Sequence, residues 1–109
     1  MMRIAMSPAA SGLLRGLLSR SNVPRDRILL TEFRSVDWQS LTFVGERHEI
    51  QLRIPGPDAE AVATALTGGL SNEEFAIPGQ IVADIVVIGE LRAEDGSVSL
   101  TIEALTIAD

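Results

Sequence analysis

The sequence predicts an α+β fold, a two-layer sandwich in which helices cover a mixed four-stranded sheet, with the order α-β-β-α-β-β. Four segments rich in β-branched residues alternate between apolar and polar positions, as strands do. Two other segments carry apolar residues at helical spacing. Turn residues separate the strand segments in pairs, which predicts two hairpins joined by a helix.

The composition indicates one small folded domain. A chain of 109 residues can build a single core, so we expect one α+β domain over 1–109. Hydrophobic residues make up 46% of the chain, which excludes disorder and suggests that some apolar surface is buried between subunits. The net charge of −6 disfavours a nucleic-acid partner. The chain has no cysteine, which fits a reducing, cytoplasmic location and excludes thiol chemistry.

The first helix is expected over residues 7–21, after a disordered start at 1–6. Ser7 suits the N-cap and Pro8 the first helical position. One apolar stripe follows, formed by Leu13, Leu14, Leu17 and Leu18. Residues 1–25 carry four arginines and no acid, a composition also found in targeting segments and in helices that lie on membranes. We favour a helix that docks on the sheet, rather than a targeting segment or a membrane-surface helix, and we do not expect a membrane partner.

Two strands are predicted in the first half of the chain, over 27–36 and 41–54, with the connection DWQS between them. Within the second strand, Leu41 and Phe43 have the opposite parity to the later apolar residues. A one-residue bulge near Gly45 would bring all of them to one face.

A second helix is predicted over AEAVATALT, residues 59–67, with Asp58 or Gly56 as its cap. Ser71 and Glu74 have the spacing of a capping box, which predicts one further turn.

The third strand, 80–92, is apolar on both faces through its middle, so we expect a central strand covered on both sides. Its first face would be formed by Ile81, Ala83, Ile85, Val87 and Leu91. Its second face would be formed by Val82, Asp84, Val86 and Ile88. That second face needs a cover, for which we expect a second subunit in a homodimer or the first helix. The turn AEDG leads to a fourth strand over 97–107.

Asp84 is the one acid in the apolar middle of the third strand. A buried ionised carboxylate costs several kcal/mol unless it is paired. We therefore expect an arginine across the sheet (Arg34, Arg47, Arg53 or Arg92), a subunit interface, or a pocket where the acid does acid–base work. We favour the arginine or the interface.

His48 is the only histidine, and with the Gly45 bulge it would share the inward face with Glu46. Together with Asp84, these residues are the candidates for an acid–base or mixed metal cluster. A Glu-x-His spacing on a strand is common, so the structural role of a hydrogen-bonded histidine is favoured. We assign no metal site and no cofactor.

Arg47 and Trp38 are the candidate ligand-binding residues, and Trp38 could instead cover the end of the sheet. The blocks WQSLTFVGERH (38–48) and IPGQIVADIVV (77–87) resemble a pattern in a family of small bacterial proteins of unknown function. The resemblance covers about half of the chain. It implies that the two blocks belong to one design, and it implies no activity.

The function that the sequence favours is a small homo-oligomeric binding or interaction module without catalytic activity. The alternative is a small enzyme or small-molecule binder that uses Asp84 and His48. A weaker third possibility is a protein anchored to a membrane by the first helix.

Overall fold

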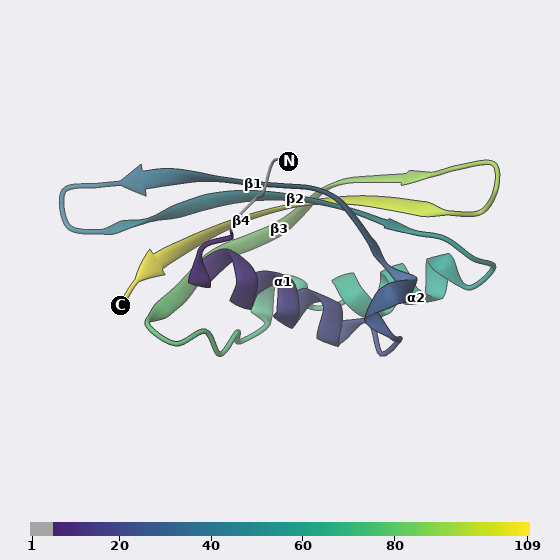
Figure 1. The fold of residues 1–109 in the computed structure, drawn as a ribbon, viewed down its shortest axis with the longest axis horizontal. Helices are drawn as coiled ribbons and strands as arrows, with labels where there is room; N and C mark the ends of the chain where they lie inside the picture. The colour runs from purple at the N-terminus through teal and green to yellow at the C-terminus, as the bar shows by residue number, and fades with distance from the viewer. Residues whose placement is uncertain (1–5) are drawn as a thin grey trace, which may run out of the picture.

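The computed structural model of the protein describes residues 6–109 and has two helices and a four-stranded sheet. The elements in chain order are α1 (Pro8–Arg20), β1 (Leu29–Gln39), β2 (Val44–Ile54), α2 (Ala59–Thr67), β3 (Gln80–Arg92) and β4 (Val98–Ala108). Short 3-10 turns lie at Arg25–Arg27 and Leu70–Asn72. Both helices lie on the same side of the sheet (Figure 1), so the α+β class and the element order are confirmed.

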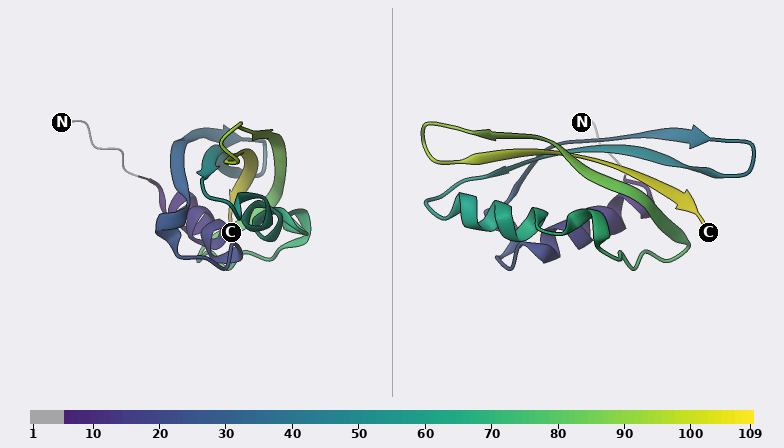
Figure 2. Two further views of the ribbon diagram at one scale, coloured as in Figure 1. Left: turned by 90° about the vertical axis from the view of Figure 1, so that its right-hand side faces the viewer. Right: turned by 180° about the vertical axis from the view of Figure 1, so that it is seen from behind.

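The sheet has the strand order β1-β2-β4-β3, and every neighbouring pair is antiparallel. The predicted mixed sheet is therefore wrong, because β4 lies between β2 and β3 and keeps these two parallel strands apart. The central position predicted for β3 is also wrong, because β3 is an edge strand. The strands twist and curve into an arch over the two helices (Figure 2).

The core lies between the helices and the central strands β2 and β4. The fully buried large side chains are Ile50, Leu52 and Ile54 of β2, Leu100 and Ile102 of β4, Leu13 and Leu17 of α1, and Leu66 of α2. In β4 the alternation of buried and half-buried positions is regular from Val98 to Thr106, as predicted. The face of the sheet that contacts the helices is called the inner face below, and the opposite face the outer face.

Helix α1 begins as the sequence predicts. Ser7 is the N-cap, and its hydroxyl accepts a 3.1 Å hydrogen bond from the Ala10 amide. Of the predicted stripe, Leu13, Leu14 and Leu17 are buried, and Leu18 is half-buried against the core. Disorder was expected over residues 1–6, but Met6 packs against the core, and residues 1–5 lie outside the described part of the chain.

Helix α2 ends against the last turn of α1. The Arg20 side chain donates through Nε to the Leu66 carbonyl at 2.8 Å and through Nη2 to the Gly68 carbonyl, and it pairs with Glu73. These bonds satisfy carbonyls that have no partner within α2. At the other end of α2, Asp58 holds the N-cap position, but its carboxylate pairs with Arg27.

The β1–β2 hairpin is longer than predicted, because β1 continues through most of the expected DWQS connection to Gln39. The bulge predicted near Gly45 is absent. Gly45 pairs with Trp38 of β1 and with Ile107 of β4, and neither register shifts there. Leu41 and Phe43 therefore stay outside the core, 105% and 53% exposed. The tip of the hairpin projects beyond the helices (Figure 1).

Glycine is needed at position 45 for a reason other than a bulge. A Cβ atom at this position would lie 2.0 Å from the Thr106 carbonyl oxygen of the neighbouring strand. Only glycine permits this approach of β2 to β4.

Two bulges in β3 change which of its residues face the core. Ala83 and Ile88 are the extra residues, at register shifts between Val82 and Asp84 and between Val87 and Gly89. The inner face is consequently formed by Val82, Ile85 and Val87. Ile81 and Leu91, predicted to share a face with Ile85, lie on the outer face and are 50% and 75% exposed.

Candidate functional site

No helix within residues 6–109 covers the outer face of the sheet, because both helices lie against the inner face (Figure 1). Directly paired residues of antiparallel strands point to the same face, so the register gives the arrangement of its side chains. Read across β1, β2, β4 and β3, the first row at the β1–β2 hairpin end is Trp38, Gly45, Ile107 and Ile81. The second row is Val36, Arg47, Leu105 and Asp84, and the third is Arg34, Glu49, Glu103 and Val86.

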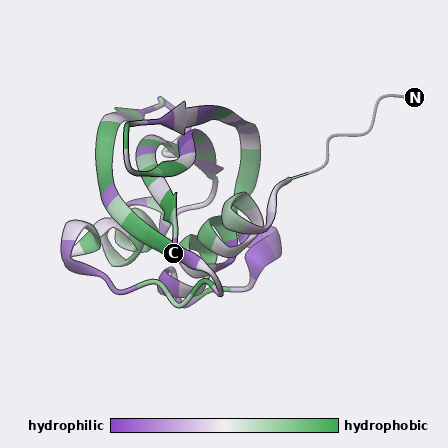
Figure 3. Cartoon of the chain, turned by 90° about the vertical axis from the view of Figure 1, so that its left-hand side faces the viewer, coloured by the Kyte–Doolittle hydropathy of each residue, from purple (hydrophilic) through white to green (hydrophobic). Residues whose placement is uncertain are grey.

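Apolar side chains gather in these rows. We name them the outer apolar patch: Val36, Trp38, Ile81, Val86, Leu105 and Ile107. Val36, Ile81 and Val86 are 60%, 50% and 42% exposed, and the other three are half-buried. The exposed hairpin tip, with Leu41 and Phe43, extends the same end of the sheet. Seen along the strands from this end (Figure 3), hydrophobic residues occupy the arch of the sheet as well as the helices beneath it.

Trp38, a candidate ligand-binding residue, belongs to this patch and packs opposite the bare backbone of Gly45. The sequence signal for the rest of the patch lies in β4. The first three outward positions of β4 are polar, and the last two are apolar. In order they are Ser99, Thr101, Glu103, Leu105 and Ile107.

Arg47 and Asp84 are both exposed and lie in the second row, on either side of Leu105. Two strand spacings, about 10 Å, separate their backbones, and Leu105 of β4 lies between them. Neither residue makes an ion pair in residues 6–109. The other arginines proposed as partners of Asp84 are paired elsewhere: Arg34 with Glu49 at 3.4 Å, Arg53 with Asp95 at 3.0 Å and Arg92 with Glu60 at 2.9 Å.

His48 lies on the inner face and is 1% exposed. Its Nδ1 lies 2.8 Å from the Ser35 hydroxyl, and its Nε2 lies 2.8 Å from the Thr106 hydroxyl. Phe33 contacts the imidazole edge-on, with ring centroids 5.9 Å apart. Both ring nitrogens are thus engaged, which leaves none for a substrate or a metal.

Burial lowers the pKa of His48 below its ordinary value of 6.5, and the nearby Glu46 carboxylate opposes this shift only in part. The ring is therefore neutral at pH 7. The Thr106 hydroxyl lies 3.4 Å from the Glu46 carbonyl, to which it donates, so it accepts from Nε2–H. Nδ1 then accepts from Ser35. This assignment gives every polar atom of the cluster a partner, as expected of a structural histidine.

Glu46 also has a structural partner. Its Oε1 accepts a 2.7 Å hydrogen bond from the Ser7 hydroxyl, the N-cap of α1. Glu46 and His48 share the inner face as predicted, whereas Asp84 lies on the outer face. The structure therefore does not bring the three acid–base candidates together. No three acidic or histidine side chains converge on a metal-sized site within the described residues.

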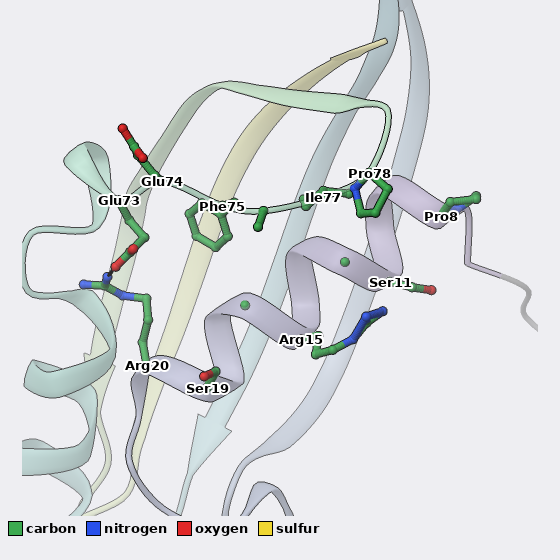
Figure 4. Close-up of a pocket in the computed structure, with 13 residues that line it drawn as sticks. Pro8, Ser11, Arg15, Ser19, Arg20, Glu73, Glu74, Phe75, Ile77 and Pro78 are labelled. Carbon is green, nitrogen blue, oxygen red and sulfur yellow. Dashed lines mark hydrogen bonds and ion pairs between the residues drawn. The ribbon is translucent and has the colours of Figure 1, made fainter. Parts of the chain in front are cut away.

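A groove of about 640 Å³ runs between α1 and the extended segment 73–78 (Figure 4). Phe75 and Ile77 lie over the glycines of α1: a Cβ at Gly16 would lie 2.6 Å from Phe75, and one at Gly12 would lie 2.8 Å from Ile77. The face of α1 that carries Gly12 and Gly16 is thus itself a packing surface. Two of the charged side chains that line this groove, Arg20 and Glu73, pair with each other.

No helix in the described part of the chain is long and apolar enough to cross a membrane. Comparisons of the chain with protein-family models, with curated proteins and with solved structures give no match, so the candidate site rests on the geometry of the outer face.

Proposed function

We propose that this protein is a homo-oligomeric interaction module without catalytic activity, and that it assembles through the outer face of its sheet. The observation that carries the proposal is the outer apolar patch. Single exposed apolar residues are common on protein surfaces, but a group of six on one face of the sheet, contributed by β1, β4 and β3, indicates a binding surface.

A second copy of the chain is the partner that the surface fits best. Sheets that present an apolar face commonly stack on another sheet, and most soluble oligomers are built from identical chains. The composition agrees, because 46% hydrophobic residues is high for a small chain that stays monomeric. A cytoplasmic location fits a chain without cysteine.

The acid–base alternative has weaker support. A catalytic pair of His48 and Asp84 would need side chains on one face, whereas the sheet separates them. The lowered pKa of His48 has a structural cause, which is burial between two hydroxyl partners.

The test is the oligomeric state measured by sedimentation equilibrium over a concentration series up to high micromolar. We expect a dimer, and we expect Ile81→Glu to weaken it by at least about tenfold, because the change puts a charge into a desolvated apolar contact. Leu91→Glu is the matched control, since Leu91 lies on the same strand and face at the far end of the sheet. Circular dichroism and thermal unfolding verify that both variants fold. A monomeric wild type, or equal weakening by both variants, would contradict the proposal.

A further inference from the structure

We infer that two copies of the chain pair through Ile81, Leu105 and Ile107 of the outer apolar patch, about a two-fold axis that runs along β4, with Arg47 of each subunit against Asp84 of the other. This inference rests on the proposed homo-oligomeric function and specifies its interface. Three features of the first two rows carry it.

The first feature is charge. Arg47 is the one arginine of the sheet without an ion pair in residues 6–109, and Asp84 lies in the same row without a pair. They flank Leu105 symmetrically, one strand to each side. A surface that presents a cation and an anion at equal distances from a central apolar residue is complementary to its own rotated copy.

The second feature is the direction of the axis. A two-fold axis along β4 places β2 of one subunit over β3 of the other, so Arg47 meets the partner's Asp84 twice in the dimer. An axis across the strands would instead place Arg47 over the partner's Arg47. Like charges that meet in a desolvated interface repel each other, so the charges select the axis along β4.

The third feature is shape. The same rotation places Ile81 over Gly45 of the partner subunit, because these two residues flank Ile107 in the first row. Gly45 has no side chain and lies between Trp38 and Ile107, which makes a notch in the surface. The half-exposed Ile81 side chain fits this notch, and Leu105 and Ile107 meet their own copies on the axis.

The third row limits the contact. It holds Glu49 and Glu103, and rotation about β4 would bring Glu103 over the partner's Glu103. We therefore confine the interface to the hairpin end of the sheet.

Charge reversal tests the pairing. Arg47→Glu and Asp84→Arg should each weaken the dimer by at least about tenfold, since each puts two like-charged contacts into the interface. The double variant Arg47→Glu/Asp84→Arg should restore it. Mixing the two single variants should also produce a heterodimer, because both of its cross-subunit contacts then join opposite charges. One contact joins the new glutamate of the first variant to the new arginine of the second, and the other joins the unchanged Asp84 to the unchanged Arg47.

Glu32→Arg is the control for the change in net charge made by Asp84→Arg, because Glu32 lies on the outer face outside the first three rows. It should leave the dimer unchanged. If the wild type is monomeric, the proposed function itself fails. If the wild type is dimeric and Ile81→Glu dissociates it, but mixing the two charge variants restores nothing, only the pairing inferred here is overturned.

Discussion

The Ser7 hydroxyl donates a 2.7 Å hydrogen bond to Oε1 of Glu46, and the same hydroxyl accepts from the Ala10 amide at 3.1 Å. One side chain thus caps α1 and ties its first turn to β2. The Glu46 carboxylate also lies near the positive end of the helix dipole.

We expect Ser7→Ala to lower the free energy of unfolding by about 1–2 kcal/mol, because it removes the cap and leaves Glu46 without its donor. Urea unfolding followed by circular dichroism measures this change. Ser19→Ala, an exposed serine of the same helix, is the control and should be within about 0.5 kcal/mol of wild type. Equal effects of the two substitutions would show that the cap contributes nothing specific.

His48 should make stability depend on pH near neutrality. Its pKa in the folded state is below 6.5, so the unfolded chain binds a proton that the folded chain does not. The free energy of unfolding therefore has its full value above the ordinary pKa of histidine. It decreases as the pH drops below that pKa, by at most about 1.4 kcal/mol per pH unit.

Urea unfolding at several pH values between about 5 and 7.5 tests this, because the pKa values of Asp58 and Asp95 are lowered from 3.8 and their own effects fall below about pH 5. His48 is the only histidine, and His48→Gln keeps hydrogen-bonding capacity without a titrating group. The slope should disappear in this variant. A slope that persists in His48→Gln would assign it to other groups.

Gly45→Ala should destabilise the sheet by about 1–3 kcal/mol, because the new Cβ would collide with the Thr106 carbonyl, a backbone atom that cannot turn away. The matched control is Gly89→Ala in β3, where a Cβ would lie 3.5 Å from Thr101, an ordinary contact. Gly89→Ala should be neutral or slightly stabilising. Thermal unfolding of both variants measures the difference, and similar melting temperatures would disprove the close-approach explanation.

Arg20→Ala should cost about 1–3 kcal/mol, because the carbonyls of Leu66 and Gly68 lose their donor at the end of α2. Arg15→Ala removes the same charge from an exposed position of the same helix and makes no ion pair in the described residues. It should be close to neutral in urea unfolding. Hydrogen exchange should show faster opening of the last turn of α2 in Arg20→Ala alone, and unchanged exchange there would contradict the capping role.

Much of the fold could be predicted from residues whose local preference for helix, strand or turn agrees with their place in the structure. Ser7-Pro8 fixes the start of α1, and the alternation from Val98 to Ala104 fixes the face of β4 that packs on the core. The face of His48 is also predictable. The failures come from parity, because one extra residue reverses every assignment beyond it. Nothing local marks Ala83 or Ile88 as bulged residues.

The bulge predicted near Gly45 is wrong for a physical reason. A glycine in a strand serves a bulge or a close approach of another backbone, and only the neighbouring strand distinguishes the two. That neighbour, Thr106, lies about sixty residues later in the chain. The row that contains Arg47, Leu105 and Asp84 could not be predicted either. These residues lie on three strands, and only the strand order brings them together.

The strand order also constrains when the chain can fold. The central pairing joins β2 to β4, from Gly45↔Ile107 to Ile54↔Val98, so the core closes across more than forty residues of intervening chain. During synthesis, the first hairpin and α1 emerge without the strand that buries their apolar side chains. We therefore expect a nascent chain lacking residues 98–108 to remain unfolded and protease-sensitive, and folding to be slow for its size because its contacts are distant in sequence.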